Sequence, residues 1–152
     1  MAKKMRDMLS NCQEAQASCA CFNLRKAARA VTHFYEGFLQ ETGLRVTQLS
    51  ILFASYLAGE VTVSRLADEL GMDRTTLTRN LKPLQDQGLI SVKSGGDRRT
   101  KAITLTLKGK EVLSRALPMW KKAQEQLVSR LGSGRFRSLL VELSATVSAA
   151  RS

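Results

Sequence analysis

The stretch Val63–Gly109, VSRLADELGMDRTTLTRNLKPLQDQGLISVKSGGDRRTKAITLTLKG, decides the fold of this chain. Its first half is typical of a short helix, a tight turn and a second helix. Ser64 is a candidate cap for the first helix, and Gly71 follows that helix at a position where left-handed backbone is usual. Asp73 is a strong N-cap candidate for the second helix. The stretch therefore predicts two helices that meet at a tight turn.

The second of these helices has one apolar face and one polar face. Leu77, Leu81 and Leu84 recur at i, i+4 and i+7, which places them together on the inward side. Two helices of this kind are typical of a helix-turn-helix. A merely solvated helix face has the same pattern, so this helix alone does not decide between the two. The polar face carries hydroxyl groups and positive charges that can reach phosphates or base edges: Thr75, Thr78, Arg79 and Lys82.

Two short strands follow, joined by a strongly positive loop. Leu89–Val92 is an apolar strand, and residues 102–107 alternate apolar and polar side chains at period two. The loop between them, KSGGDRRTK at residues 93–101, contains paired glycines that allow a tight reversal. In a winged helix this tip reaches the minor groove, where the negative potential favours arginine. Asp97 either orients one guanidinium, that of Arg99, or serves ordinary turn chemistry, and both interpretations stay open.

The charge of the chain is positive and unevenly distributed. Its 152 residues carry 24 Lys and Arg against 13 Asp and Glu, a net charge of +11 with an isoelectric point of about 10.1. Residues 71–110 hold nine basic and three acidic side chains, a net charge of +6 within about a quarter of the chain. Such a balance indicates a polyanionic partner, nucleic acid or an anionic membrane surface. Its concentration on the predicted winged helix favours DNA.

The order of elements and several short motifs resemble the MarR family (multiple antibiotic resistance regulators) of bacterial transcription factors. The most specific motif is Asp97-Arg98-Arg99, followed at fixed spacing by Leu105-Thr106 and then Gly109. VSRLA at 63–67, DRTTLTR at 73–79 and LQDQGLI at 84–90 fit as well. The resemblance extends along nearly the whole chain. It implies a mainly α fold in a single domain, with a winged helix-turn-helix at about 46–109 and dimerisation helices at about 1–45 and 110–152.

The flanking segments have helical periodicity. Residues up to about Asn11 are polar and are predicted to be frayed or held by a partner chain. The first and last helices carry more apolar surface than a small winged helix can cover, so we expect them to pack together and against a twofold mate. The predicted helices are Ala17–Glu41, Val46–Gly59 with Leu49, Leu52, Phe53, Tyr56 and Leu57 buried, a helix from Gly109 to Leu131, and a last helix capped by Ser133.

Three cysteines, Cys12, Cys19 and Cys21, crowd the N-terminal region. They can sense oxidants or bind a soft metal or metalloid, or they can pack as buried, inert thiols. Residues two apart on a helix point about 200° apart, so Cys19 and Cys21 would share one ligand set only in an unwound segment or across a dimer. Both interpretations stay open.

The resemblance implies a homodimeric, sequence-specific transcriptional regulator, usually a repressor in families like this, released by a small-molecule or redox signal. Two recognition helices would enter successive major grooves at half-sites roughly 10 bp apart on a pseudo-palindrome. Arg79, Thr75 and Thr78 are expected at bases or nearby phosphates, and Arg74 and Lys82 at phosphates, with Arg98 or Arg99 in the minor groove. The full predicted DNA-binding set is Arg74, Thr75, Thr76, Thr78, Arg79, Lys82, Asp97, Arg98, Arg99 and Lys101.

The resemblance also implies a pocket for a small aromatic ligand between the dimer helices and the winged helix. His33, Tyr35, Phe38 and Trp120 are candidates because they lie on elements that can line such a cleft. By itself, His33 is more typical of an exposed or satisfied histidine, and Trp120 of a core or interface anchor. Two other functions remain as alternatives. One is an architectural DNA-binding protein without sequence preference, and the other is a thiol-based sensor of oxidants or soft metals on the same scaffold.

An enzyme is not expected, and neither is a metal or cofactor. The sequence has no glycine loop that cradles phosphate, no Cys/His metal set, one histidine and no carboxylate pair in a catalytic setting. No apolar run approaches the ~20 residues of a membrane span, and the basic N-terminal residues lack the apolar segment of a secretory signal. We therefore expect a cytoplasmic protein without structural disulfides.

Overall fold

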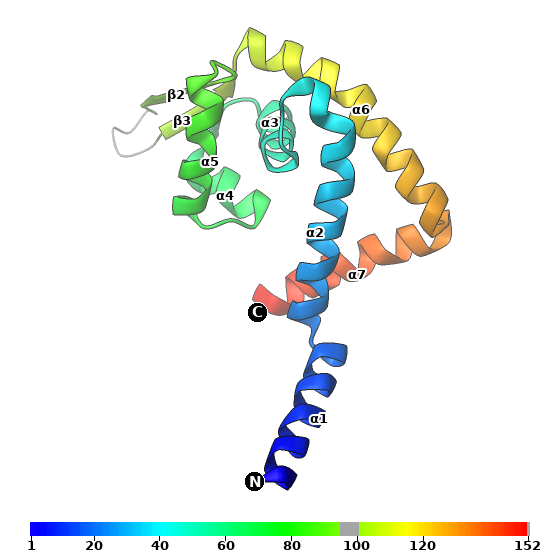
Figure 1. Ribbon diagram of the computed structural model, residues 1–152. Helices are drawn as coiled ribbons and strands as arrows, with labels where there is room; N and C mark the ends of the chain where they lie inside the picture. Colours follow the sequence, from blue (N-terminus) through cyan, green and yellow to red (C-terminus); the bar gives the residue numbers. More distant parts are fainter. Residues whose placement is uncertain (95–100, 152) are drawn as a thin grey trace.

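The computed structural model describes residues 1–94 and 101–151 (Figure 1). The described part is mainly helical, with a small sheet of three strands, which confirms the predicted fold class. Its elements are α1 (Ala2–Ser18), α2 (Ala20–Leu39), the 3-10 helix η1 (Gln40–Thr42), α3 (Val46–Ala58), β1 (Val61–Thr62), α4 (Val63–Leu70), α5 (Arg74–Asp86), β2 (Ile90–Ser94), β3 (Lys101–Leu105), α6 (Leu107–Leu131) and α7 (Ser133–Arg151).

Helices α4 and α5 form the predicted helix-turn-helix. The cap of α4 is Thr62, two residues earlier than expected, because its hydroxyl accepts the N–H of Arg65 at 3.3 Å while Ser64 already lies inside the helix. Gly71 ends α4 with φ at +64°, and its N–H donates to the carbonyl of Ala67. A side chain would strain this left-handed backbone, so glycine suits the turn.

The sheet has the order β1-β3-β2, with both pairs antiparallel. Ile103 on the central strand faces Val61 on one side and Val92 on the other, and it is fully buried. Val61–Thr62 thus adds a short third strand beside β3. The β2–β3 pair is in register from Ile90 opposite Leu105 to Ser94 opposite Lys101.

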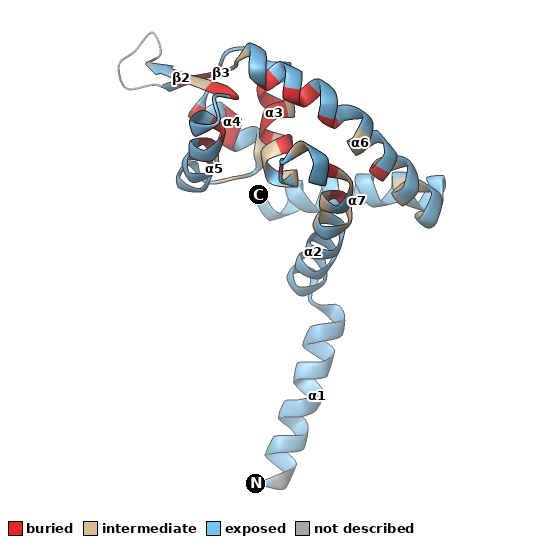
Figure 2. Cartoon of the chain, turned by 45° about the horizontal axis from the view of Figure 1, so that its top comes forward, coloured by how far each residue is buried: buried red, intermediate tan, exposed pale blue. Residues whose placement is uncertain are grey.

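Helix α3 lies at the centre of the hydrophobic core (Figure 2). Ile51 and Leu52 are fully buried, and so is the hydroxyl-bearing Ser55. The prediction that Tyr56 and Leu57 belong to the buried set is wrong, because they are 55% and 81% exposed. Helix α3 packs against α4, α5, α6 and β3, and Ser55 lies on its buried side.

Helices α2, α6 and α7 form an arm beside the winged helix (Figure 1). Helix α6 begins at Leu107, before the expected Gly109, because Thr106 caps it. The first predicted helix begins at Ala20, since Cys19 has extended backbone (φ −68°, ψ 113°). The residues expected to be frayed or held by a partner form the separate helix α1, which projects away from the rest of the chain.

Candidate nucleic-acid interface

Helix α5 begins at a strong N-cap and is held in place by one apolar face. The Asp73 carboxylate accepts the N–H of Thr76 at 2.8 Å and its hydroxyl at 2.6 Å. These bonds, the hydroxyl first, hold the pKa of Asp73 below its usual value, so the carboxylate stays charged beside the positive end of the helix dipole. Leu77, Leu81 and Leu84 are buried, as their spacing predicted.

The opposite face of α5 is exposed, and its hydroxyl groups differ in what they can still bind. The Thr78 hydroxyl donates to the carbonyl of Arg74 at 2.7 Å, which leaves it free to accept. The Thr76 hydroxyl is committed to the N-cap carboxylate. The Thr75 hydroxyl has no hydrogen-bond partner within the described ranges, so it keeps its full capacity to donate and accept. Arg79 is exposed on the same face.

Lys82 is the one residue of this face with an ion pair inside the described part of the chain. Its Nζ lies 3.0 Å from Oδ2 of Asp86, one turn further along α5, and both side chains are mostly exposed. An exposed pair of this kind contributes little to stability, about 0–1 kcal/mol, and is easily exchanged for another anion. Lys82 can therefore release Asp86 and bind a phosphate.

A groove of about 320 Å³ separates α5 from the strands β2 and β3. Thr78, Arg79 and Lys82 line it from the helix, and the exposed Lys101 lines it from β3. Gln85, which was not among the sequence candidates, also lines the groove. The signal was available, because Thr78, Lys82 and Gln85 stand at i, i+4 and i+7. The predicted wing contacts Asp97, Arg98 and Arg99 lie outside the described residues.

The N-terminus of α6 fixes the strands to the end of α5. The Thr106 hydroxyl donates to the Gly88 carbonyl at 2.7 Å and accepts the N–H of Gly109 at 3.0 Å, and the Thr106 N–H donates to the Leu89 carbonyl at 3.1 Å. A Cβ on Gly109 would lie 2.0 Å from that Leu89 oxygen, so only glycine fits. The Leu-Thr and Gly motif therefore joins the helix-turn-helix, the sheet and α6 in one rigid junction.

A second concave region lies between α2, α3, α6 and α7, with a cavity of about 510 Å³. Tyr35 and Trp120, two of the four ligand candidates, line it, and the Tyr35 hydroxyl donates to Oε1 of Gln124. Burial raises the pKa of Tyr35, so its hydroxyl stays protonated. Phe38 lies on a different depression, between α2 and α6, and His33 is exposed and lines neither. Gln124 was missed because no local pattern links it to Tyr35.

The three cysteines are exposed, so the interpretation of them as buried packing residues does not hold within this chain. Cys12 lies on α1, and Cys19 stands at the break before α2, where its sulfur accepts the N–H of Phe22 at 3.5 Å. Among the described residues, no group of three or more His, Cys, Asp and Glu could hold a metal ion. None of the helices described is long and apolar enough to cross a membrane.

Similarity to known proteins agrees with this geometry. The MarR family model matches residues 42–100. The transcriptional regulator MosR of M. tuberculosis, crystallised in complex with DNA, is 38% identical to this chain, and the alignment covers 89% of this chain and 100% of MosR with a TM-score of 0.78.

Two further relatives are more distant. The organic hydroperoxide resistance transcriptional regulator of Bacillus subtilis is 33% identical over 90 residues, which span 59% of this chain and 61% of that protein. A mutant MarR of E. coli complexed with operator DNA is 17% identical and has the same fold, with a TM-score of 0.78 over 87% of this chain and 96% of that one. Together with the winged helix and its exposed basic face, these similarities show that the chain belongs to the MarR family of DNA-binding transcriptional regulators, which are not enzymes.

Proposed function

We propose that this protein is a homodimeric repressor that binds a pseudo-palindromic operator sequence-specifically and leaves it when a signal arrives. The observation that carries the proposal is the exposed polar face of α5, which stands beside a groove shared with the wing strands. A face of hydroxyl groups and arginine reads base edges in the major groove, whereas an architectural protein needs only phosphate contacts.

The contacts within α5 suggest different roles for the predicted DNA-binding residues. Among the described residues, Thr75 and Arg79 have side-chain polar groups without a partner and are the best candidates for base contacts, and Thr78 can serve as an acceptor. Lys82, which is tied weakly to Asp86, suits a phosphate. Thr76 acts through Asp73 by fixing the start of the helix, and it is therefore a positioning residue.

Exposed apolar side chains on α7 and α2 support the homodimer. None of the described residues of α7 is buried, although the helix carries Leu139, Leu140, Leu143 and Val147. Val31, on the neighbouring α2, is also 39% exposed and lines the same cavity as these three leucines. A twofold mate that covers this face would set the spacing of two recognition helices to about one DNA turn, or roughly 10 bp between half-sites.

Two features can receive the signal. The cavity lined by Tyr35 and Trp120 is mainly apolar and has one polar pair, which suits a small aromatic molecule. The exposed thiols Cys12, Cys19 and Cys21 suit an oxidant, and one relative of this chain is an organic hydroperoxide resistance regulator. Either kind of signal, the aromatic molecule or the oxidant, acts by favouring one spacing of the recognition helices over another.

The deciding experiment is fluorescence anisotropy of the reduced protein against its own upstream DNA and against a scrambled duplex, over a salt series. We expect a preference of about a thousandfold for the upstream DNA. Equal affinity for both duplexes with a steep salt slope would instead support the architectural alternative. An operator elsewhere in the genome would then be sought by selection of bound sites.

Matched variants assign the roles. Arg79→Ala should weaken operator binding about tenfold or more, and Arg29→Ala, which removes the same charge from the exposed surface of α2, should change it little. Arg99→Ala should also weaken operator binding more than tenfold if the wing enters the minor groove. A variant with all three cysteines changed to serine distinguishes the signals, because it should ignore oxidant and still respond to an aromatic ligand.

A further inference from the structure

Within the described chain, helix α1 contacts only the start of α2, where the Asn23 amide donates to the carbonyls of Gln16 and Ala17 at 3.3 and 3.2 Å. All of its described side chains are exposed, and the helix projects beyond the N-terminus of α2 (Figures 1 and 2). It has no side-chain cap, and its first turn carries Lys3 and Lys4 but no acidic residue. Basic residues there oppose the helix dipole, and most of the stability of a helix in a protein comes from tertiary packing of its apolar face. The helix therefore needs a partner.

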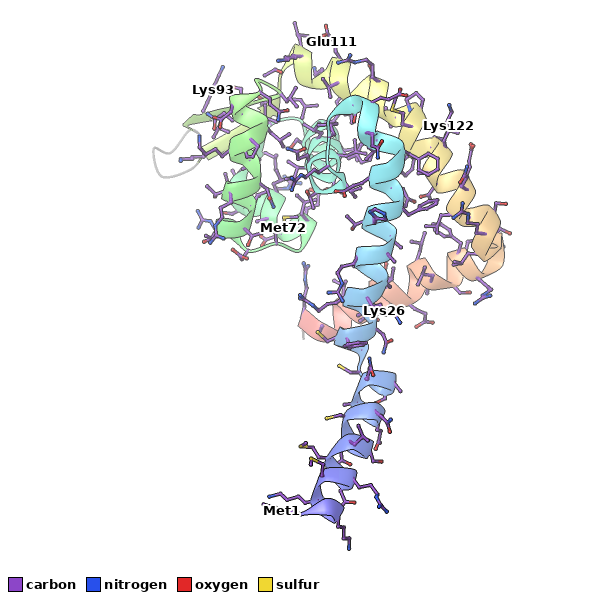
Figure 3. All side chains as sticks on the ribbon, viewed as in Figure 1. Met1, Lys26, Met72, Lys93, Glu111 and Lys122 are labelled. Carbon is purple, nitrogen blue, oxygen red and sulfur yellow. The ribbon has the colours of Figure 1, made fainter. Side chains whose placement is uncertain are left out.

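The apolar residues of α1 follow the spacing of a coiled-coil seam. Met5, Met8, Cys12 and Ala15 stand three, four and three residues apart, the alternation of a and d positions in a heptad. At 3.6 residues per turn they fall within about 80° of arc. The sulfur atoms along α1 gather on one side of the helix (Figure 3). Met5 and Met8 are 67% and 59% exposed, so the seam is uncovered.

The charged residues leave this seam free for a like copy. On the helical wheel, Lys3, Arg6, Asp7 and Glu14 all fall on the side opposite the seam. Beyond Lys4 the flanking positions are uncharged, with Leu9 and Asn11 on the two sides. Two identical helices can therefore approach without bringing like charges together. The narrow seam and the mixed charges of the opposite side fit a helix better than a membrane surface, which favours a broad apolar face and a basic polar face.

We propose that α1 pairs with the α1 of a second copy as a short parallel coiled coil. The proposal rests on the homodimer proposed above: because α1 leads directly into α2, a mate that covers the exposed face of α2 and α7 also holds a second α1 in the same dimer. The exposed Leu24 stands seven residues before Val31 on the same side of α2, so it extends the apolar face that the mate covers toward α1. A seam this short would pair weakly alone, but tethering by the dimer raises its effective concentration to about millimolar.

Cysteine crosslinking tests the pairing in the full-length protein. In a background with Cys19→Ser and Cys21→Ser, only Cys12 remains, and serine preserves the cap at position 19. In a parallel pair the two Cys12 side chains face each other, so copper phenanthroline should join them into a covalent dimer. The matched control changes Cys12→Ser and Ser10→Cys, which moves the thiol to the opposite side of α1. We expect crosslinking of the control to be about ten times slower, since a parallel pair brings together only seam positions.

A second pair of variants separates pairing from chance encounter. Met8→Glu places charge on the seam and should abolish the fast crosslinking at Cys12, whereas Ser10→Glu should leave it unchanged. Sedimentation and operator binding are measured on the same samples. A protein that stays dimeric and binds its operator, but crosslinks equally at positions 10 and 12, overturns the coiled coil alone. A monomeric protein overturns the homodimer as well. The protein is also sedimented with anionic lipid vesicles. If it co-sediments with them, if Met8→Glu abolishes this binding, and if Cys12 crosslinks slowly, the coiled coil is overturned in favour of a membrane surface.

Discussion

Replacing Gly109 with alanine tests the junction that holds the wing to α6. The added Cβ would lie 2.0 Å from the Leu89 carbonyl oxygen, and contacts under 3.0 Å are essentially absent for real Cβ atoms, so α6 or the carbonyl must move by at least 1.0 Å. The same oxygen accepts the N–H of Thr106 at 3.1 Å, and such a shift stretches that bond. The perturbation therefore loosens α6 from the end of α5 and from β2.

The expected magnitude combines three effects. Alanine gains about 1 kcal/mol over glycine in a helix, overpacking against backbone costs about 1–3 kcal/mol, and a weakened hydrogen bond costs about 1 kcal/mol. Gly109→Ala should thus lower the free energy of unfolding by about 1–3 kcal/mol in urea unfolding followed by circular dichroism at fixed protein concentration.

Gly37→Ala is the matched control for this substitution. Gly37 lies on the exposed side of α2, and a Cβ there meets nothing within 4 Å. Alanine at position 37 should therefore raise the free energy of unfolding by about 0.5–1 kcal/mol. If Gly109→Ala stabilises the protein as Gly37→Ala does, the close contact at Leu89 is absent and the reasoning fails. Operator affinity should fall with Gly109→Ala and stay constant with Gly37→Ala.

Three further predictions address single side chains. Ser55→Ala should raise the free energy of unfolding by about 1 kcal/mol, because the Ser55 hydroxyl is buried without a partner among the described residues. The control Ser50→Ala should not raise it, because the Ser50 hydroxyl donates to the Val46 carbonyl at 3.0 Å. A lower free energy of unfolding for Ser55→Ala would mean that the Ser55 hydroxyl has a partner. Asp73 has a lowered pKa when folded, so its contribution is complete above the unfolded-state pKa and is lost as the pH falls through the folded-state value. As the pH is lowered into the acid range, the melting temperature should fall more steeply for the native protein than for Asp73→Asn. Parallel curves of melting temperature against pH would contradict this. Asp86→Asn frees Lys82 and should raise DNA affinity a few-fold in anisotropy titrations with a steeper salt dependence, while Asp7→Asn, an equal change of charge on α1, should have little effect.

Local features of the sequence predicted the DNA-binding unit well. The Asp73 cap, the buried Leu77, Leu81 and Leu84, and the antiparallel strands all appear as expected. Each of these features depends on interactions within a few residues, or on apolar residues that recur with a period of 3.6 or 2 and can be read directly from the sequence. The polar face of α5 was predicted for the same reason. The fates of its hydroxyl groups were not, because they depend on which acceptor each side chain reaches.

Contacts between distant residues were decided only by the tertiary structure. Helix α3 is apolar on nearly every side, so its sequence could not show that Ser55 is buried while Tyr56 is exposed. Which side of α3 is buried depends on how α4, α5 and α6 pack against it. Tyr35 and Gln124 are 89 positions apart, and only the arm of α2 and α6 brings them together. The sequence motif Thr106 and Gly109 was visible, but its role as a junction required the Leu89 carbonyl, 20 residues before Gly109. Sequence thus determined the elements and their polar faces, since these follow from local hydrogen bonds and helical period, and the fold determined which surfaces meet.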